Sequence, residues 1–141
     1  WDVTTEAFFL GAGSLGEALL GYPGFADCGL SIVAAFDVDP NKCHRVIHGK
    51  HVRHISKMPG LMRRMRVRFG IITVPASEAQ QAAELLVEGG ALAIWNFAAA
   101  KIRVPERVIV TNEDLYCSLA VLSQKMTRKL AESRSKGVSK S

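Results

Sequence analysis

The chain has 141 residues, 48% hydrophobic and 22% charged, which is enough for one globular domain with a buried core. No apolar run approaches the roughly 18 residues of a membrane-spanning helix, so we expect no contact with a membrane. The net charge of +5 is compatible with a nucleic-acid partner, but many of the basic residues lie in residues 63–68 and 125–140. We interpret these stretches as a solvated helix face and a disordered tail.

The three cysteines are odd in number, and none forms a C-x-x-C pair. Cys28, Cys43 and Cys117 are therefore interpreted as reduced thiols of a cytoplasmic protein, not as a disulfide framework or a zinc site. The first residue is Trp1 and not Met, which favours a truncated chain over a protein that stands alone.

The first predicted strand, residues 7–10, runs into a glycine turn (residues 11–16) with the pattern G-x-G-x-x-G, and a helix is predicted from Leu15 to about Gly21. Gly11 permits a tight strand-to-helix turn, Gly13 lets a pyrophosphate approach the backbone, and Gly16 lets the helix pack closely on the strand. The free N–H groups at the helix start suit a pyrophosphate.

A second strand at residues 30–36, apolar except for Ser31, ends in Asp37, which lies 21 residues beyond Gly16. An acidic residue at that position accepts hydrogen bonds from the hydroxyls of an adenosine ribose, which favours NAD over NADP. An ordinary strand–turn–helix connection without a ligand is the alternative.

All four histidines lie in residues 44–54. A helix would place His44 and His48 on one face, but no cysteine or carboxylate completes a ligand set, so we predict solvated histidines and no metal site. Neither this segment nor the arginine cluster at residues 63–68 has an assigned role.

The remaining pattern predicts a helix from residue 58, a buried strand at 69–74, a helix to about 87, and strands at 91–95 and 108–110. Alternating strands and helices predict an α/β fold of Rossmann type, with a mostly parallel, doubly wound sheet over residues 1–111. Ligands of such sheets bind beyond the carboxyl ends of the strands. The candidate cofactor-binding residues at these ends are Gly11, Ala12, Gly13, Ser14, Leu15, Gly16, Asp37, Val38, Val74, Pro75, Ala76, Asn96 and Phe97.

From residue 112 the pattern changes to a long helix, predicted over residues 112–131 and followed by a disordered tail at 132–141. Its apolar stripe must be buried on its own sheet or on another chain. The stripe consists of Leu115, Leu119, Leu122, Met126 and Leu130.

Several of these stretches together resemble the sensor domain of the Rex family of redox-sensing transcriptional repressors. The Tyr-Pro-Gly-Phe and Phe-Asp-Val-Asp-Pro motifs are the most specific. The similar stretches are residues 11–16, 18–25, 32–40, 74–76, 96–98, 104–105 and 112–115.

The resemblance implies a non-catalytic Rossmann domain that senses the NADH/NAD⁺ ratio as a homodimer with a swapped C-terminal helix. It implies that NADH closes the dimer and releases operator DNA, which is held by a winged-helix domain absent from this chain. Tyr22 and Asp114 would form a polar switch pair across the dimer. Residues 74–76 and 96–97 would line the nicotinamide region.

Two other functions remain open. A small NAD-dependent dehydrogenase is one, although the strand ends carry no set of catalytic residues. A CoA-binding domain of related fold is the other, although Asp37 favours an unphosphorylated ribose diol over a phosphate-bearing one.

Overall fold

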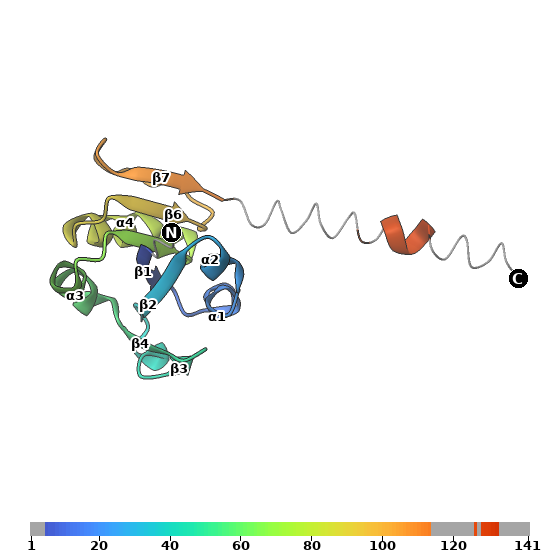
Figure 1. The fold of residues 1–141 in the computed structure, drawn as a ribbon, viewed down its shortest axis with the longest axis horizontal. Coiled ribbons are helices and arrows are strands. Elements are labelled where there is room, and N and C mark those ends of the chain that lie inside the picture. The colour runs from blue at the N-terminus through green and yellow to red at the C-terminus, as the bar shows by residue number, and fades with distance from the viewer. Residues whose placement is uncertain (1–4, 114–125, 127, 133–141) are drawn as a thin grey trace, which may run out of the picture.

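The computed structural model describes residues 5–113, 126 and 128–132. A seven-stranded sheet with the order β3-β4-β2-β1-β5-β6-β7 forms the centre of the molecule (Figure 1). All neighbouring strands are parallel except β3 and β4. The prediction of a mostly parallel Rossmann-type sheet is therefore confirmed. The strands are β1 (Thr5–Leu10), β2 (Leu30–Asp37), β3 (Val46–Ile47), β4 (Lys50–His54), β5 (Phe69–Ile72), β6 (Ala93–Asn96) and β7 (Ile109–Asn112).

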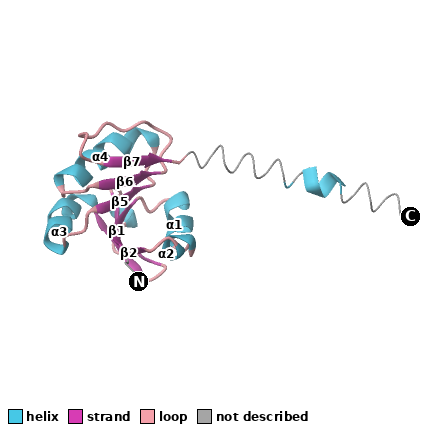
Figure 2. Ribbon diagram, turned by 45° about the horizontal axis from the view of Figure 1, so that its top comes forward, coloured by secondary structure: helices cyan, strands magenta, loops and turns pink. Residues whose placement is uncertain are grey.

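Helices cover both faces of the sheet (Figure 2). Helices α1 and α2 lie on one face, and α3 and α4 lie on the other. The helices are α1 (Ser14–Leu20), α2 (Gly24–Asp27), α3 (Met58–Met65) and α4 (Ala79–Glu88), with 3₁₀ turns η1 (Pro40–Lys42), η2 (Ile55–Lys57) and η3 (Ala76–Glu78).

The last four residues of the central strand β1, Ala7 to Leu10, are buried on both faces of the sheet, which explains why all four are apolar. Phe8 and Leu10 join the core under α3 and α4, whereas Ala7 and Phe9 join the core under α1 and α2. The chain passes from β1 to β2 on one side and later returns to β5 on the other. The carboxyl ends of β1 and β5 therefore flank the point where the strand order reverses, which is where open α/β sheets bind ligands.

The histidine-rich segment contains a β-hairpin, so His44 and His48 do not share a helix face. Both residues have left-handed backbones, with φ of 67° and 48°, and His48 with Gly49 forms the two-residue turn between β3 and β4. Two consecutive residues with positive φ are typical of the type I′ turn, whose twist matches that of a hairpin.

The helix predicted over residues 112–131 does not include its first expected residue. Asn112 is the last residue of β7, where it pairs with Asn96, so the helix predicted over residues 112–131 does not start there. Of the apolar stripe, Met126 and Leu130 are helical and exposed. Asp114, Leu115, Leu119 and Leu122 lie outside the described residues, as does the tail from residue 133.

None of the helices in the described ranges is long and apolar enough to cross a bilayer.

Candidate functional site

The glycine turn joins the end of β1 to α1 through close backbone contacts. Gly11 has φ of +113°, a conformation that side chains rarely permit, and a Cβ there would collide with the side chain of Thr73. A Cβ on Gly16 would overlap the carbonyl of Gly11. The first turn of α1 therefore packs directly on the glycine turn. Gly13 begins this helix without a side-chain cap, which leaves the N–H groups of its first turn available.

Two side chains fix the turn to the neighbouring strands. The hydroxyl of Thr73, just after β5, donates to the carbonyl oxygens of Leu10 (2.9 Å) and Gly11 (3.3 Å). The buried carboxylate of Asp37, at the end of β2, accepts from the backbone N–H of Ala12 at 2.6 Å and from that of Asp39 at 2.8 Å. The glycine turn is thus held from both sides.

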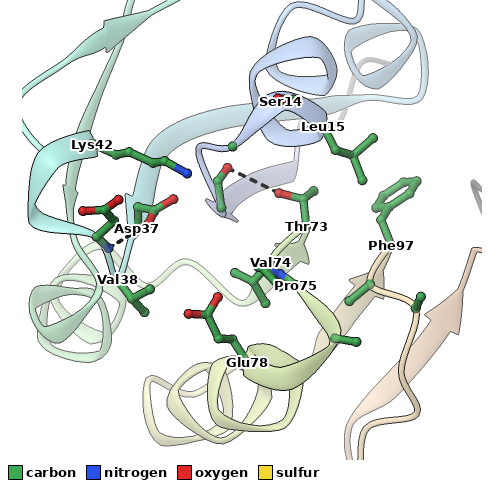
Figure 3. A pocket seen from close by; sticks show the side chains of 16 residues that line it. Ser14, Leu15, Asp37, Val38, Lys42, Thr73, Val74, Pro75, Glu78 and Phe97 are labelled. Carbon is green, nitrogen blue, oxygen red and sulfur yellow. Dashed lines mark hydrogen bonds between the residues drawn. The ribbon is translucent and has the colours of Figure 1, made fainter.

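A cavity of about 560 Å³ lies over the carboxyl ends of the strands, and we name it the dinucleotide pocket (Figure 3). Of the candidate cofactor-binding residues, all but Ala12, Gly16 and Asn96 line it. Ala12 and Gly16 are buried in the turn beneath. The lining consists of Gly11, Gly13, Ser14, Leu15, Asp37, Val38, Asp39, Lys42, Thr73, Val74, Pro75, Ala76, Glu78, Phe97, Ala98 and Ala99.

The pocket has a polar end and an apolar end. Figure 3 shows Asp37 and Lys42 on one side of the cavity and Leu15 with Phe97 on the other. Lys42 extends toward the glycine turn, where its Nζ lies 3.6 Å from the position that a Cβ on Gly13 would take. A ligand with a charged part and a flat apolar part would match this division.

Six residues of the lining were not predicted from the sequence: Asp39, Lys42, Thr73, Glu78, Ala98 and Ala99. Lys42 belongs to η1, in which the N–H of Asn41 donates to the side chain of Asp39, and this short turn directs the lysine toward the cavity. The sequence could have indicated Lys42 as a pocket residue, because it lies in the loop that directly follows β2.

Asn96 organises the connection after β6 and does not line the cavity. It is 1% exposed, and its Nδ2 donates to the Ala100 carbonyl at 2.9 Å and to Oδ1 of Asn112 at 3.0 Å. Its Oδ1 accepts from the N–H of Ala98 at 3.0 Å. These bonds position the loop that carries Phe97 into the pocket.

An aromatic cluster connects the pocket wall to the surface. Phe97 lies with its ring centroid 4.9 Å from that of Trp95, and both rings contact Phe25 edge-on. Tyr22 packs edge-on against Phe25 at 5.7 Å and is 56% exposed. The indole Nε1 of Trp95 is buried without a hydrogen-bond partner among the described residues.

Cys43 directly follows Lys42 of the pocket lining. Burial, and after it the carboxylates of Asp37 and Asp39, raise the pKa of this thiol. Cys43 is therefore a neutral thiol at neutral pH, which makes it a poor nucleophile. Within the described ranges, no group of three histidine, cysteine or acidic side chains is arranged to hold a metal ion.

Comparison with known proteins points to one group. The family model of the CoA binding domain matches residues 2–100. The chain is 43% identical over 129 residues to the redox-sensing transcriptional repressor Rex of Treponema denticola, covering 92% of this chain and 61% of that protein. It is 40% identical over 131 residues to Rex of Caldicellulosiruptor saccharolyticus, covering 93% and 60%. The chain thus spans about three-fifths of the length of these relatives.

Solved structures of a Rex-family repressor named RSP superpose on the chain. The TM-score is 0.79 at 30% identity, covering 96% of this chain and 65% of that one. The complex of RSP with β-NADH gives a TM-score of 0.77 at 30% identity, with coverage of 93% and 63%. The complex with β-NAD⁺ and operator DNA also gives 0.77 at 30% identity, with coverage of 95% and 62%.

Two glycine substitutions test the architecture of the turn. Gly16→Ala should lower the free energy of unfolding by roughly 1–3 kcal/mol, because its Cβ overlaps the Gly11 carbonyl. Gly13→Ala is the matched control, since its Cβ meets only the Lys42 Nζ at 3.6 Å, and it should cost less than about 1 kcal/mol. Urea denaturation followed by circular dichroism measures both. Equal losses would contradict the described packing.

Proposed function

The chain belongs to the CoA-binding domain family and is related to the Rex redox-sensing transcriptional repressors, and from that premise we propose that it is the domain with which such a repressor senses NADH against NAD⁺. The observation that carries the proposal is the two-ended pocket over the glycine turn. Its polar end holds Asp37 and Lys42, and its apolar end holds Leu15, Pro75 and Phe97.

Each part of a dinucleotide has a complementary place in this pocket. The pyrophosphate would lie over Gly13, where the N–H groups of the helix start and the ammonium of Lys42 offer positive charge. The adenosine ribose would lie near Asp37, whose two oxygens each keep a lone pair beyond the bonds to Ala12 and Asp39. The nicotinamide would lie between Leu15 and Phe97.

Discrimination between the two redox forms follows from the apolar end. The oxidised nicotinamide ring carries a positive charge, and the reduced ring is neutral. Moving a charge into an apolar site costs free energy unless it is paired, so this end favours NADH. A ligand shifts the balance between two conformations only by the difference in its affinity for them. A sensor therefore requires that NADH and NAD⁺ differ in how strongly they favour one conformation.

The alternative functions are weaker. A dehydrogenase needs a proton donor or acceptor next to the nicotinamide, whereas the labelled side chains at the apolar end are Leu15 and Phe97 (Figure 3). The relatives are named transcriptional repressors. CoA binding is favoured by the description of the matching family model. Against it, the phosphate on the CoA ribose would approach the carboxylates of Asp37 and Asp39.

Homodimer formation is supported by an incompletely covered part of the sheet. On the face that carries α1 and α2, Ile109 of β7 is 71% exposed, Thr111 is exposed, and Trp95 of β6 is only half-buried. We propose that the apolar stripe of the C-terminal helix of a second copy covers this surface. Tyr22 and Asp114 would then meet across the dimer, and NADH would favour the closed arrangement.

In the complete repressor, operator DNA would be held by a winged-helix domain and released when the sensor dimer closes. RSP has been seen with operator DNA in its NAD⁺-bound state. The two Rex relatives are longer than this chain, and the part of their length that it does not cover could hold such a domain.

A ligand titration tests the sensing function. NADH should bind at least about tenfold more tightly than NAD⁺, a difference of ~1.4 kcal/mol. Energy transfer from tryptophan to bound NADH gives the signal, because Trp95 contacts Phe97 in the pocket wall. NAD⁺ and CoA are then measured by displacement of NADH, and NADPH, which gives the same signal as NADH, is titrated directly. Equal affinities for NADH and NAD⁺ would overturn the sensing function, and tighter binding of CoA would favour the alternative.

The role of Lys42 can be separated from redox discrimination. Because the pyrophosphate is common to both ligands, Lys42→Ala should weaken NADH and NAD⁺ by the same factor, on the order of tenfold. The ratio of the two affinities should not change. Lys101→Ala removes an exposed lysine outside the pocket lining and serves as the control. A change confined to NADH would place Lys42 at the nicotinamide instead.

The dimer surface is tested by charge insertion. Ile109→Lys should shift the chain from dimer to monomer in sedimentation equilibrium, because a buried, unpaired ammonium at an interface is strongly unfavourable. Val46→Lys is the matched control, since Val46 is an apolar residue with 57% exposure on β3 at the opposite edge of the sheet. A dimer that survives Ile109→Lys would mean that another surface joins the two copies.

A further inference from the structure

A second groove lies between α3, α4 and η2, on the sheet face opposite α1 and α2. Its volume is about 560 Å³, and it shares no residue with the dinucleotide pocket. We name it the basic groove. Its lining consists of Arg53, Ser56, Lys57, Pro59, Gly60, Leu61, Arg63, Arg64, Leu85 and Glu88.

Positive charge dominates this groove. Four cationic side chains stand against the single carboxylate of Glu88. All four are exposed, and in the part of the chain that the structure describes the one ion pair joins Arg45 to Glu17. Nη1 of Arg63 donates to the backbone carbonyl of Glu88 at 3.0 Å, which fixes that arginine at the rim. The others remain available to an anionic partner.

The fold itself gathers these charges. Helix α3 buries Met58, Pro59 and Met62 against the core, so its opposite face turns Arg63 and Arg64 outward. Arg53 comes from the end of β4, and Lys57 comes from η2 directly before the helix. The four cationic residues, which lie up to eleven positions apart in sequence, thus contribute to one surface. Such a surface is more than a run of basic residues on a solvated helix.

We infer that the basic groove binds the phosphate backbone of double-stranded DNA. The choice of DNA rests on the proposed function, because a repressor domain works beside an operator. Guanidinium groups match phosphate oxygens in a bidentate manner. Contacts of this kind carry no sequence information but add affinity and hold the protein in register on the duplex.

The chemistry of the lining disfavours other polyanions. Protein interfaces are anchored by buried aromatic side chains as well as arginines, and single-stranded nucleic acids stack their bases on aromatic rings. The basic groove has no aromatic residue, and its apolar lining is limited to Pro59, Leu61 and Leu85. A duplex backbone presents phosphates without exposed bases, which fits a groove whose charged groups are four cations and one carboxylate.

Salt-dependent binding tests the inference with the whole 141-residue chain. Binding to a fluorescent DNA duplex is measured by anisotropy at several salt concentrations. In the double variant Arg53→Ala/Arg64→Ala, the slope of log K against log salt should fall in magnitude by about 2, since each neutralised phosphate contributes ~0.9. Affinity at low salt should fall at least about tenfold.

The double variant Lys101→Ala/Arg107→Ala is the matched control. It removes the same charge from exposed positions outside the groove, and the lysine-rich stretch from residue 125 stays identical in every variant. Its slope should remain within about 0.5 of the parent value, well below the change of one phosphate contact. Equal losses in both variants, or no loss in either, would overturn the inference.

Two further measurements separate the possible failures. Poly-glutamate of the same charge as the duplex should compete poorly for the chain. Competition equal to that of DNA would overturn the inference and indicate that the groove binds an acidic protein. NADH binding is measured in the same preparations. Normal NADH binding without a groove-dependent slope refutes only this inference. If the salt slope depends on the groove residues but the chain does not bind NADH, the result refutes the proposed sensing function instead.

Discussion

The close contact between the glycine turn and its two flanking strands is the constraint on which the pocket depends. Gly16 touches the carbonyl of Gly11, and the hydroxyl of Thr73 donates to the same carbonyl. From the other side, the carboxylate of Asp37 binds the N–H groups of Ala12 and Asp39. These contacts place the start of α1 and the loop after β2 on either side of one cavity.

This arrangement gives Asp37 two tasks. It organises the backbone of the turn, and in the proposed function it also meets the ribose. Replacing Asp37 by alanine would therefore remove both the backbone anchor and the ribose contact, and its effect on binding alone would not separate them. Lys42 and Gly13 make fewer contacts with the rest of the protein, which is why they report more directly on the ligand.

Much of the fold could be predicted from sequence because its signals are local. The apolar runs of β1 and β2 and the spacing of Gly11, Gly13 and Gly16 identify a strand–turn–helix unit without any tertiary information. The hairpin turn at His48 could not be recognised from a helix-like spacing of histidines. The position of Lys42 and the bonds of Asn96 depend on contacts between distant segments, which no local pattern encodes.

The aromatic cluster gives the proposed sensor a physical route from ligand to partner. Phe97 lies in the pocket wall and contacts both Trp95 and Phe25, and Phe25 in turn contacts the exposed Tyr22. Trp95 belongs to the same sheet face as Ile109, the most exposed apolar residue of β7. A nicotinamide that moved Phe97 would thereby alter the packing beneath the proposed dimer surface. Close-packed aromatic rings move together and not singly, so a small shift in the pocket can favour one arrangement of two subunits over another.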